Sequence, residues 1–119
     1  MYLREASDGG YSIVESPPPD SGLYIRTRGG TLTKVSIPAN CLAFQTGEAL
    51  QVATEGRLRA TPHCVRAGIT GSAGTDRISR ETFALFMGPN ADLQLSPSEN
   101  FGQFSKRIFA EHYVEVPMM

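Results

Sequence analysis

The sequence predicts a mainly β domain that ends in one α-helix, and three observations carry this prediction. Apolar and polar residues alternate in several short segments, which is the period of a strand with one buried face. Glycine- and proline-containing turns separate these segments. A helical apolar period appears only near the C-terminus. We therefore expect a sheet-rich domain over residues 1–95 and a helix over residues 96–115 that packs on the same domain.

The first half of the chain contains three predicted strands. Gly22–Arg26 and Thr31–Ile37 both alternate, and Gly29-Gly30 between them suits the tight turn of a hairpin. Asn40–Gln45 is a short apolar run of the kind found in buried strands. The segment Glu48–Thr54 that follows is too short to form more than a turn of helix.

The second half contains two more predicted strands and the helix. Thr61–Arg66 and Arg80–Met87 are the strands, and residues 67–76, rich in glycine and serine, form a surface loop between them. The helix begins at Ser96-Pro97-Ser98-Glu99, a capping box with proline at the first helical position. Its apolar face consists of Phe101, Phe104, Ile108 and Phe109.

Composition excludes several classes of protein. A chain of 119 residues with 40% hydrophobic and 19% charged residues is typical of one globular domain. No apolar run approaches the roughly 20 residues that span a bilayer, and residues 1–10 lack the apolar core of a signal peptide, so we expect a cytoplasmic protein without membrane contact. Eleven basic and twelve acidic residues leave no excess of positive charge, which argues against binding of nucleic acid. The separation of the two cysteines, Cys41 and Cys64, matches no known spacing of zinc ligands.

Two groups of residues could carry chemistry. His63 shares a strand face with Thr61 and Val65, so its imidazole points toward the interior if that face is buried. A histidine that bonds only to a backbone carbonyl is the structural alternative. Farther on, Arg80 and Thr82 lie two residues apart on a strand, and a guanidinium beside a hydroxyl can bind a carboxylate.

The arginine assignment has two alternatives. Arg80 could be a surface residue paired with Asp76 or Glu81. The same Arg-x-hydroxyl pattern also occurs three residues earlier, at Arg77 and Ser79.

The order of five motifs resembles one enzyme family. These motifs are Gly22-Leu-Tyr-Ile-Arg26, Val35-Ser-Ile-Pro38, Cys41-Leu-Ala-Phe-Gln-Thr-Gly-Glu-Ala-Leu50, Thr61-Pro-His-Cys-Val-Arg66 and Arg80-Glu-Thr-Phe-Ala-Leu-Phe-Met-Gly-Pro89. Together they are similar to the C-terminal half of the iron(II)/2-oxoglutarate-dependent oxygenases of the isopenicillin N synthase type. The resemblance implies a partial double-stranded β-helix, also called a jelly roll. It also implies that His63 is an iron ligand and that Arg80 and Thr82 bind 2-oxoglutarate.

The iron site of that family uses two histidines and one carboxylate. Asp8 lies 55 residues before His63, and by the resemblance it corresponds to the carboxylate ligand. Ala6 stands where the family has its first histidine, and the only other histidine, His112, lies on the predicted helix. Asp8 also has a structural alternative, because Ser7-Asp-Gly-Gly10 is a typical turn sequence.

Three functions are consistent with these residues. The first is oxidation of a small organic substrate with iron(II) and 2-oxoglutarate. The second is an inactive jelly-roll remnant that serves as a binding or structural module. The third is a cupin-like binding domain without 2-oxoglutarate, which two histidines support poorly. In each case we expect self-association through an exposed sheet edge, because unpaired edges recruit other strands.

Overall fold

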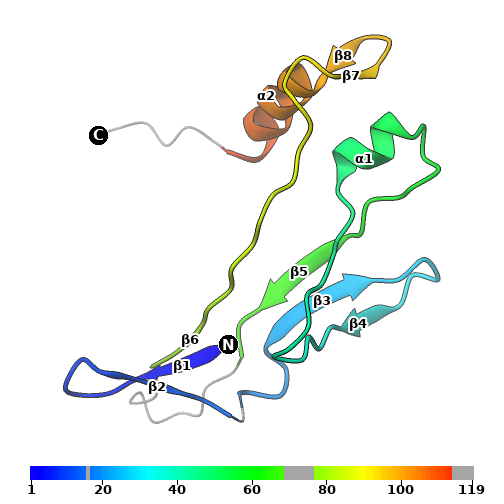
Figure 1. The fold of residues 1–119 in the computed structure, drawn as a ribbon. Coiled ribbons are helices and arrows are strands. Elements are labelled where there is room, and N and C mark those ends of the chain that lie inside the picture. Colours follow the sequence, from blue (N-terminus) through cyan, green and yellow to red (C-terminus); the bar gives the residue numbers. More distant parts are fainter. Residues whose placement is uncertain (16, 69–76, 114–119) are drawn as a thin grey trace. The chain divides into compact units, whose positions relative to one another are not determined.

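A computed structural model describes residues 1–15, 17–68 and 77–113. The chain divides into two units. Unit 1 comprises the described residues of 1–43 and 61–85, and unit 2 those of 44–60 and 86–113. The strands form small antiparallel sheets, and a helix ending at His112 is the last described element, so the expectation of a mainly β protein with a C-terminal helix is confirmed (Figure 1).

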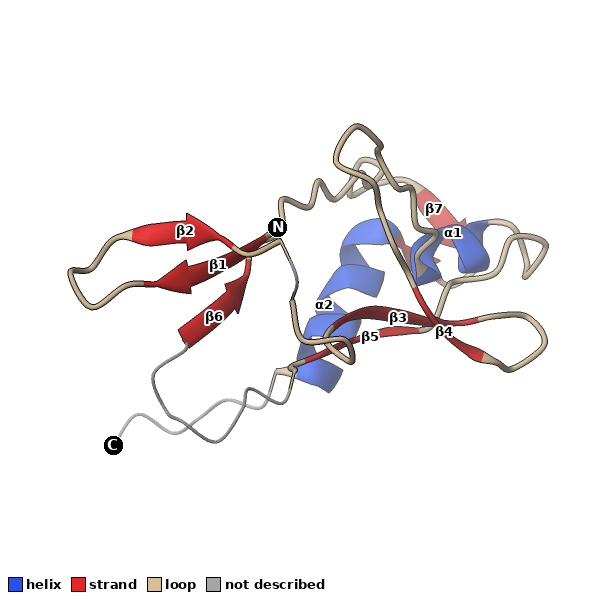
Figure 2. Cartoon of the chain, turned by 90° about the horizontal axis from the view of Figure 1, so that it is seen from below, coloured by secondary structure: helices blue, strands red, loops and turns tan. Residues whose placement is uncertain are grey.

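Unit 1 holds two three-stranded antiparallel sheets. Sheet A has the order β2-β1-β6, with β1 at Tyr2–Glu5, β2 at Tyr11–Ile13 and β6 at Arg77–Arg80. Sheet B has the order β4-β3-β5, with β3 at Gly22–Arg26, β4 at Leu32–Lys34 and β5 at His63–Arg66. The two three-stranded groups can be followed in Figure 2.

The start of β1 contacts the residue that precedes β3. Ser21 is 3% exposed, and its hydroxyl donates a hydrogen bond to the Pro18 carbonyl at 2.7 Å and lies 3.3 Å from the Tyr2 hydroxyl. Gly22 has a positive φ of 127°, and a Cβ at this position would lie 3.2 Å from the Tyr2 hydroxyl. Both the backbone conformation and the space therefore require glycine where sheet B begins.

Unit 2 contains the two helices and a short hairpin. Helix α1 spans Glu48–Ala53, six residues, and is therefore longer than the single turn expected at this position. Strands β7 (Gln94–Ser96) and β8 (Glu99–Asn100) pair directly before α2 (Phe101–His112). The buried apolar side chains of the described residues are Leu95 and Phe104, which are 6% and 7% exposed.

Several predicted elements agree with the structure. β3 has exactly the expected bounds, and β4 and β5 lie within the expected segments Thr31–Ile37 and Thr61–Arg66. The β1–β2 hairpin was not predicted. The expected loop 67–76 lies outside the described residues from position 69 onward, as do the last two residues of the helix expected over 96–115.

Two predicted strands are wrong. Asn40–Gln45 forms no strand, and Arg80–Met87 contributes only Arg80 to β6. In the β1–β6 register Tyr2 stands opposite Arg80, and Glu81 exchanges backbone hydrogen bonds with Met1. No strand of the described residues pairs with the apolar segment that follows Glu81. Strand preference alone does not form a strand without a neighbouring partner.

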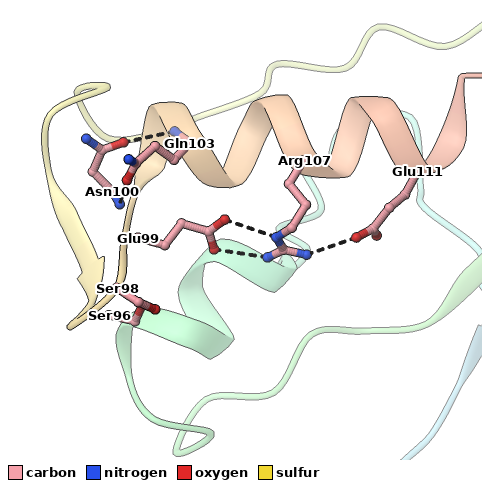
Figure 3. A network of polar contacts seen from close by, with 7 residues as sticks. All are labelled: Ser96, Ser98, Glu99, Asn100, Gln103, Arg107 and Glu111. Carbon is pink, nitrogen blue, oxygen red and sulfur yellow. Dashed lines mark hydrogen bonds and ion pairs between the residues drawn. The ribbon is translucent and has the colours of Figure 1, made fainter.

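The predicted start of the C-terminal helix is also wrong. Ser96 ends β7 and Glu99 begins β8, so neither residue caps the helix. The capping box is formed instead by Asn100 and Gln103 (Figure 3). The Asn100 side chain accepts the Gln103 N–H at 2.9 Å, and the Asn100 N–H donates to the Gln103 side chain at 2.9 Å.

An arginine ties the hairpin to the helix. Arg107 donates two hydrogen bonds of 3.0 Å to the Glu99 carboxylate and one of 3.2 Å to Glu111 (Figure 3). The hydrogen bonds from Arg107 hold the pKa of Glu99 below its usual value. On the predicted apolar face Phe104 is buried, whereas Phe109 is 60% exposed and its ring lies 5.5 Å from that of Tyr113.

Candidate functional site

The two candidate arginines lie on β6, and the register of sheet A decides what each one faces. Residues directly opposite each other in antiparallel strands have side chains on the same face, and successive residues alternate between faces. Arg77 stands opposite Glu5, and Arg80 stands opposite Tyr2. Arg77 and Arg80 are three positions apart along the strand, so their side chains are on opposite faces of sheet A.

The Arg77 face is balanced in charge. The Arg77 guanidinium lies 3.7 Å from the Glu5 carboxylate, and the Ser79 hydroxyl donates a 2.7 Å hydrogen bond to Glu81. These residues line a shallow open depression of about 460 Å³. Because the side chain of Arg77 is 83% exposed and already has a carboxylate partner, it is a poor candidate for a ligand-binding arginine.

Arg80 has a different environment. It is half-buried, and no side chain or backbone group of the described residues forms a hydrogen bond or ion pair with its guanidinium. Thr82 follows the last paired residue and is exposed. Because Thr82 lies beyond β6, the expected placement of Arg80 and Thr82 on one strand face is not confirmed. Of the two arginines, Arg77 has a carboxylate partner, whereas Arg80 has none among the described residues.

His63 is the first residue of β5. It stands opposite Ile25 in sheet B, and its Nδ1 lies 3.0 Å from the Thr61 carbonyl oxygen. Leu23 and Val65 form the next pair on the same face, so the imidazole lies at the end of an aliphatic sheet face. The side chain is exposed, so the condition under which the imidazole would point into the interior is not met. A contact between Nδ1 and a backbone carbonyl is also the usual way in which proteins orient a metal-binding imidazole.

Asp8 lies in the turn between β1 and β2. Its carboxylate accepts the Gly10 N–H at 2.8 Å, and the turn is closed by backbone hydrogen bonds between Ala6 and residues Gly9 and Gly10. This is the geometry of an Asx turn. Asp8 therefore has the role that the turn sequence predicts, and it belongs to sheet A whereas His63 belongs to sheet B.

The side chains expected to bind iron do not form a group of three metal ligands among the described residues. Among the described residues no three histidine, cysteine, aspartate or glutamate side chains lie close enough to hold a metal ion. The chain's other histidine, His112, is on α2, with its Nδ1 3.1 Å from the Ile108 carbonyl oxygen. His63 and Asp8 thus provide one imidazole and one carboxylate on separate sheets, which does not fit the family's two-histidine, one-carboxylate site.

Sequence reasoning missed the neighbours of Arg80. Tyr2 stands opposite Arg80, and Arg4, two residues along β1, lies on the same face. The alternation of Tyr2-Leu-Arg-Glu5 before the Asp8-Gly9 turn is the signal that could have revealed this strand.

No helix within 1–15, 17–68 or 77–113 is long and apolar enough to cross a membrane. Comparison with models of protein families, with curated proteins and with solved structures found no match to this chain.

Proposed function

We propose that this chain is a jelly-roll domain of the isopenicillin N synthase type of iron(II)/2-oxoglutarate-dependent oxygenase, which acts on a small organic substrate. The order of motifs from Gly22 to Pro89 carries the proposal. The half-buried Arg80, without a partner in the described part of the chain, supports its assignment to the distal carboxylate of 2-oxoglutarate. His63, at the start of β5, is the proposed imidazole ligand.

A second function is favoured by Asp8 and Ala6. The Asp8 carboxylate is engaged in its own turn, and Ala6 occupies the position of the family's first histidine. Loss of a direct ligand should weaken a metal site by more than the roughly 10–100-fold that removal of a supporting residue costs. The alternative is therefore a jelly-roll module that binds a partner without catalysis.

Anaerobic titration separates the two functions. The full chain is titrated with iron(II) and 2-oxoglutarate, and the visible charge-transfer band of the ternary complex is recorded. After addition of air, succinate is measured. We expect the band with the wild-type chain and with His112→Ala, and its loss with His63→Ala. His112→Ala is a matched control because it removes the other exposed imidazole, on α2.

The absence of both the band and succinate in the wild-type chain would contradict the oxygenase function and favour the non-catalytic module. Equal bands in the two histidine variants would show that His63 is not a ligand. In that case iron binding would need a different set of residues.

A further inference from the structure

The segment that follows β6 is apolar and has no partner in the described part of the chain. Thr82–Met87 belongs to no helix or strand, and its backbone forms no hydrogen bond with another described residue (Figure 1). Its four large apolar side chains are 76–95% exposed: Phe83, Leu85, Phe86 and Met87. A group of exposed apolar side chains of this size is typical of an interaction site.

The composition of this segment favours a strand. Thr82-Phe-Ala-Leu-Phe-Met87 contains no charged residue, no glycine and no proline, and most of its residues are common in strands. Short uncharged segments of this kind pair readily with strands of other chains. The missing element is therefore a neighbouring strand, since the residue types already suit pairing.

Both ends of the segment are held by the protein. Glu81 donates its N–H to the Met1 carbonyl at 2.8 Å and accepts a 3.2 Å hydrogen bond from the Met1 amino group. At the other end, a Cβ on Gly88 would lie 2.9 Å from the Phe101 ring, so the backbone is packed against that ring. A partner strand can therefore pair with the stretch Glu81–Met87, and not beyond it.

A second copy of this chain supplies a strand that fits. If this stretch pairs with itself in antiparallel orientation, its central residue, Ala84, stands opposite Ala84 of the second copy. Phe83 then stands opposite Leu85 of the second copy, and the two-fold symmetry repeats this pair on the same face. Cross-strand apolar pairs are stabilising, and no two like charges meet in this register.

We propose that Glu81–Met87 is an intermolecular strand, which pairs with the same stretch of a second copy in antiparallel orientation about Ala84. At roughly 150 Å² for each large apolar side chain, two copies offer on the order of 1,200 Å² of surface. This area is at the lower limit of stable protein interfaces, so the dimer forms in a concentration-dependent manner. The inference goes beyond the proposed function and does not depend on it.

Charges placed at the symmetry centre test this register. Dimerisation of the full chain is measured by sedimentation equilibrium at several protein concentrations and low ionic strength. The samples are the wild type, Ala84→Lys, Ala84→Glu and an equimolar mixture of these two variants. Ala53→Lys is the matched control, because it places the same charge on another exposed alanine, at the end of α1. Far-UV circular dichroism checks that each variant folds.

We expect Ala84→Lys and Ala84→Glu each to weaken dimerisation roughly fivefold, because like charges then stand directly opposite each other. The mixture should recover the affinity, since a lysine of one copy then faces a glutamate of the other. Ala53→Lys should dimerise like the wild type. Amide hydrogen exchange of Thr82–Met87 should slow as the concentration of the wild type rises.

A wild-type chain that stays monomeric at every concentration would overturn the proposal and would indicate that a different protein covers the segment. Equal dimerisation of the wild type and both Ala84 variants would also overturn it, because the contact would then lie elsewhere. A mixture that dimerises no better than either variant alone would refute antiparallel pairing about Ala84.

Discussion

Replacement of Asn100 by alanine tests where α2 begins. The Asn100 side chain is the acceptor for the Gln103 N–H, one of the amide groups that have no partner inside the helix. Alanine removes this acceptor but keeps the reciprocal bond from the Asn100 N–H to Gln103. We expect the variant to lower the free energy of unfolding by about 1 kcal/mol, within the usual range of about 0.5–2 kcal/mol for N-cap residues.

Ser96→Ala is the matched control, because Ser96 is the cap that the sequence predicts. In the structure its hydroxyl only contacts the Ser98 hydroxyl at 3.3 Å. We expect a change within about 0.5 kcal/mol, as for most exposed substitutions. The double variant Asn100→Ala, Gln103→Ala removes both halves of the box and should be less stable than Asn100→Ala alone.

Urea denaturation followed by circular dichroism at 222 nm measures these differences. α2 has 12 residues and α1 has six, so the signal comes mainly from α2. About 1 kcal/mol corresponds to a roughly fivefold change in the unfolding equilibrium constant. A larger loss of stability in Ser96→Ala than in Asn100→Ala would refute the placement of the cap at Asn100.

Two further predictions concern pH and association. The pKa of Glu99 is lowered by hydrogen bonds from Arg107, so its contribution to stability is present above the ordinary value of 4.5 and is lost as the pH falls through the lowered folded value. Unfolding measured from pH 6 downward should therefore show a steeper loss of stability for the wild type than for Glu99→Gln, and identical slopes would contradict this. Phe83 and Phe86 are 95% and 94% exposed, so we expect the chain to self-associate. Replacing both with serine should shift the average mass in light scattering toward the monomer, and an unchanged mass would argue against these residues.

The sequence predicted local pairing well where all the partners were nearby. β3 and its hairpin with β4 depend on the alternation of Gly22–Arg26 and on Gly29-Gly30, which are all local signals. The pairing of β1 with β6 joins segments more than 70 residues apart, and no local pattern encodes it. For this reason the apolar segment after Arg80 was predicted as a strand although it lacks a partner.

The start of α2 was predicted wrongly for a different reason. Ser96-Pro97-Ser98-Glu99 and Asn100-Gln103 both have the residue types of a capping box, and a sequence pattern alone does not rank them. In the structure Ser96 and Glu99 pair with each other in the β7–β8 hairpin. Asn100 and Gln103 are therefore the residues that cap α2. Of the candidate site, Arg80 was named from the sequence, whereas Tyr2 and Arg4, its neighbours on the same face of sheet A, could be found only once β1 was known.

The spacing of Arg77 and Arg80 also makes sheet A sensitive to strand slippage. A shift of β6 by one residue along β1 would turn over all its side chains, and would bring Arg77 to the Tyr2 side and Arg80 to the Glu5 side. The Glu5–Arg77 ion pair opposes that shift, since it forms only in the observed alignment. An ion pair on one face thereby helps to determine which arginine lies beside Tyr2 on the other face.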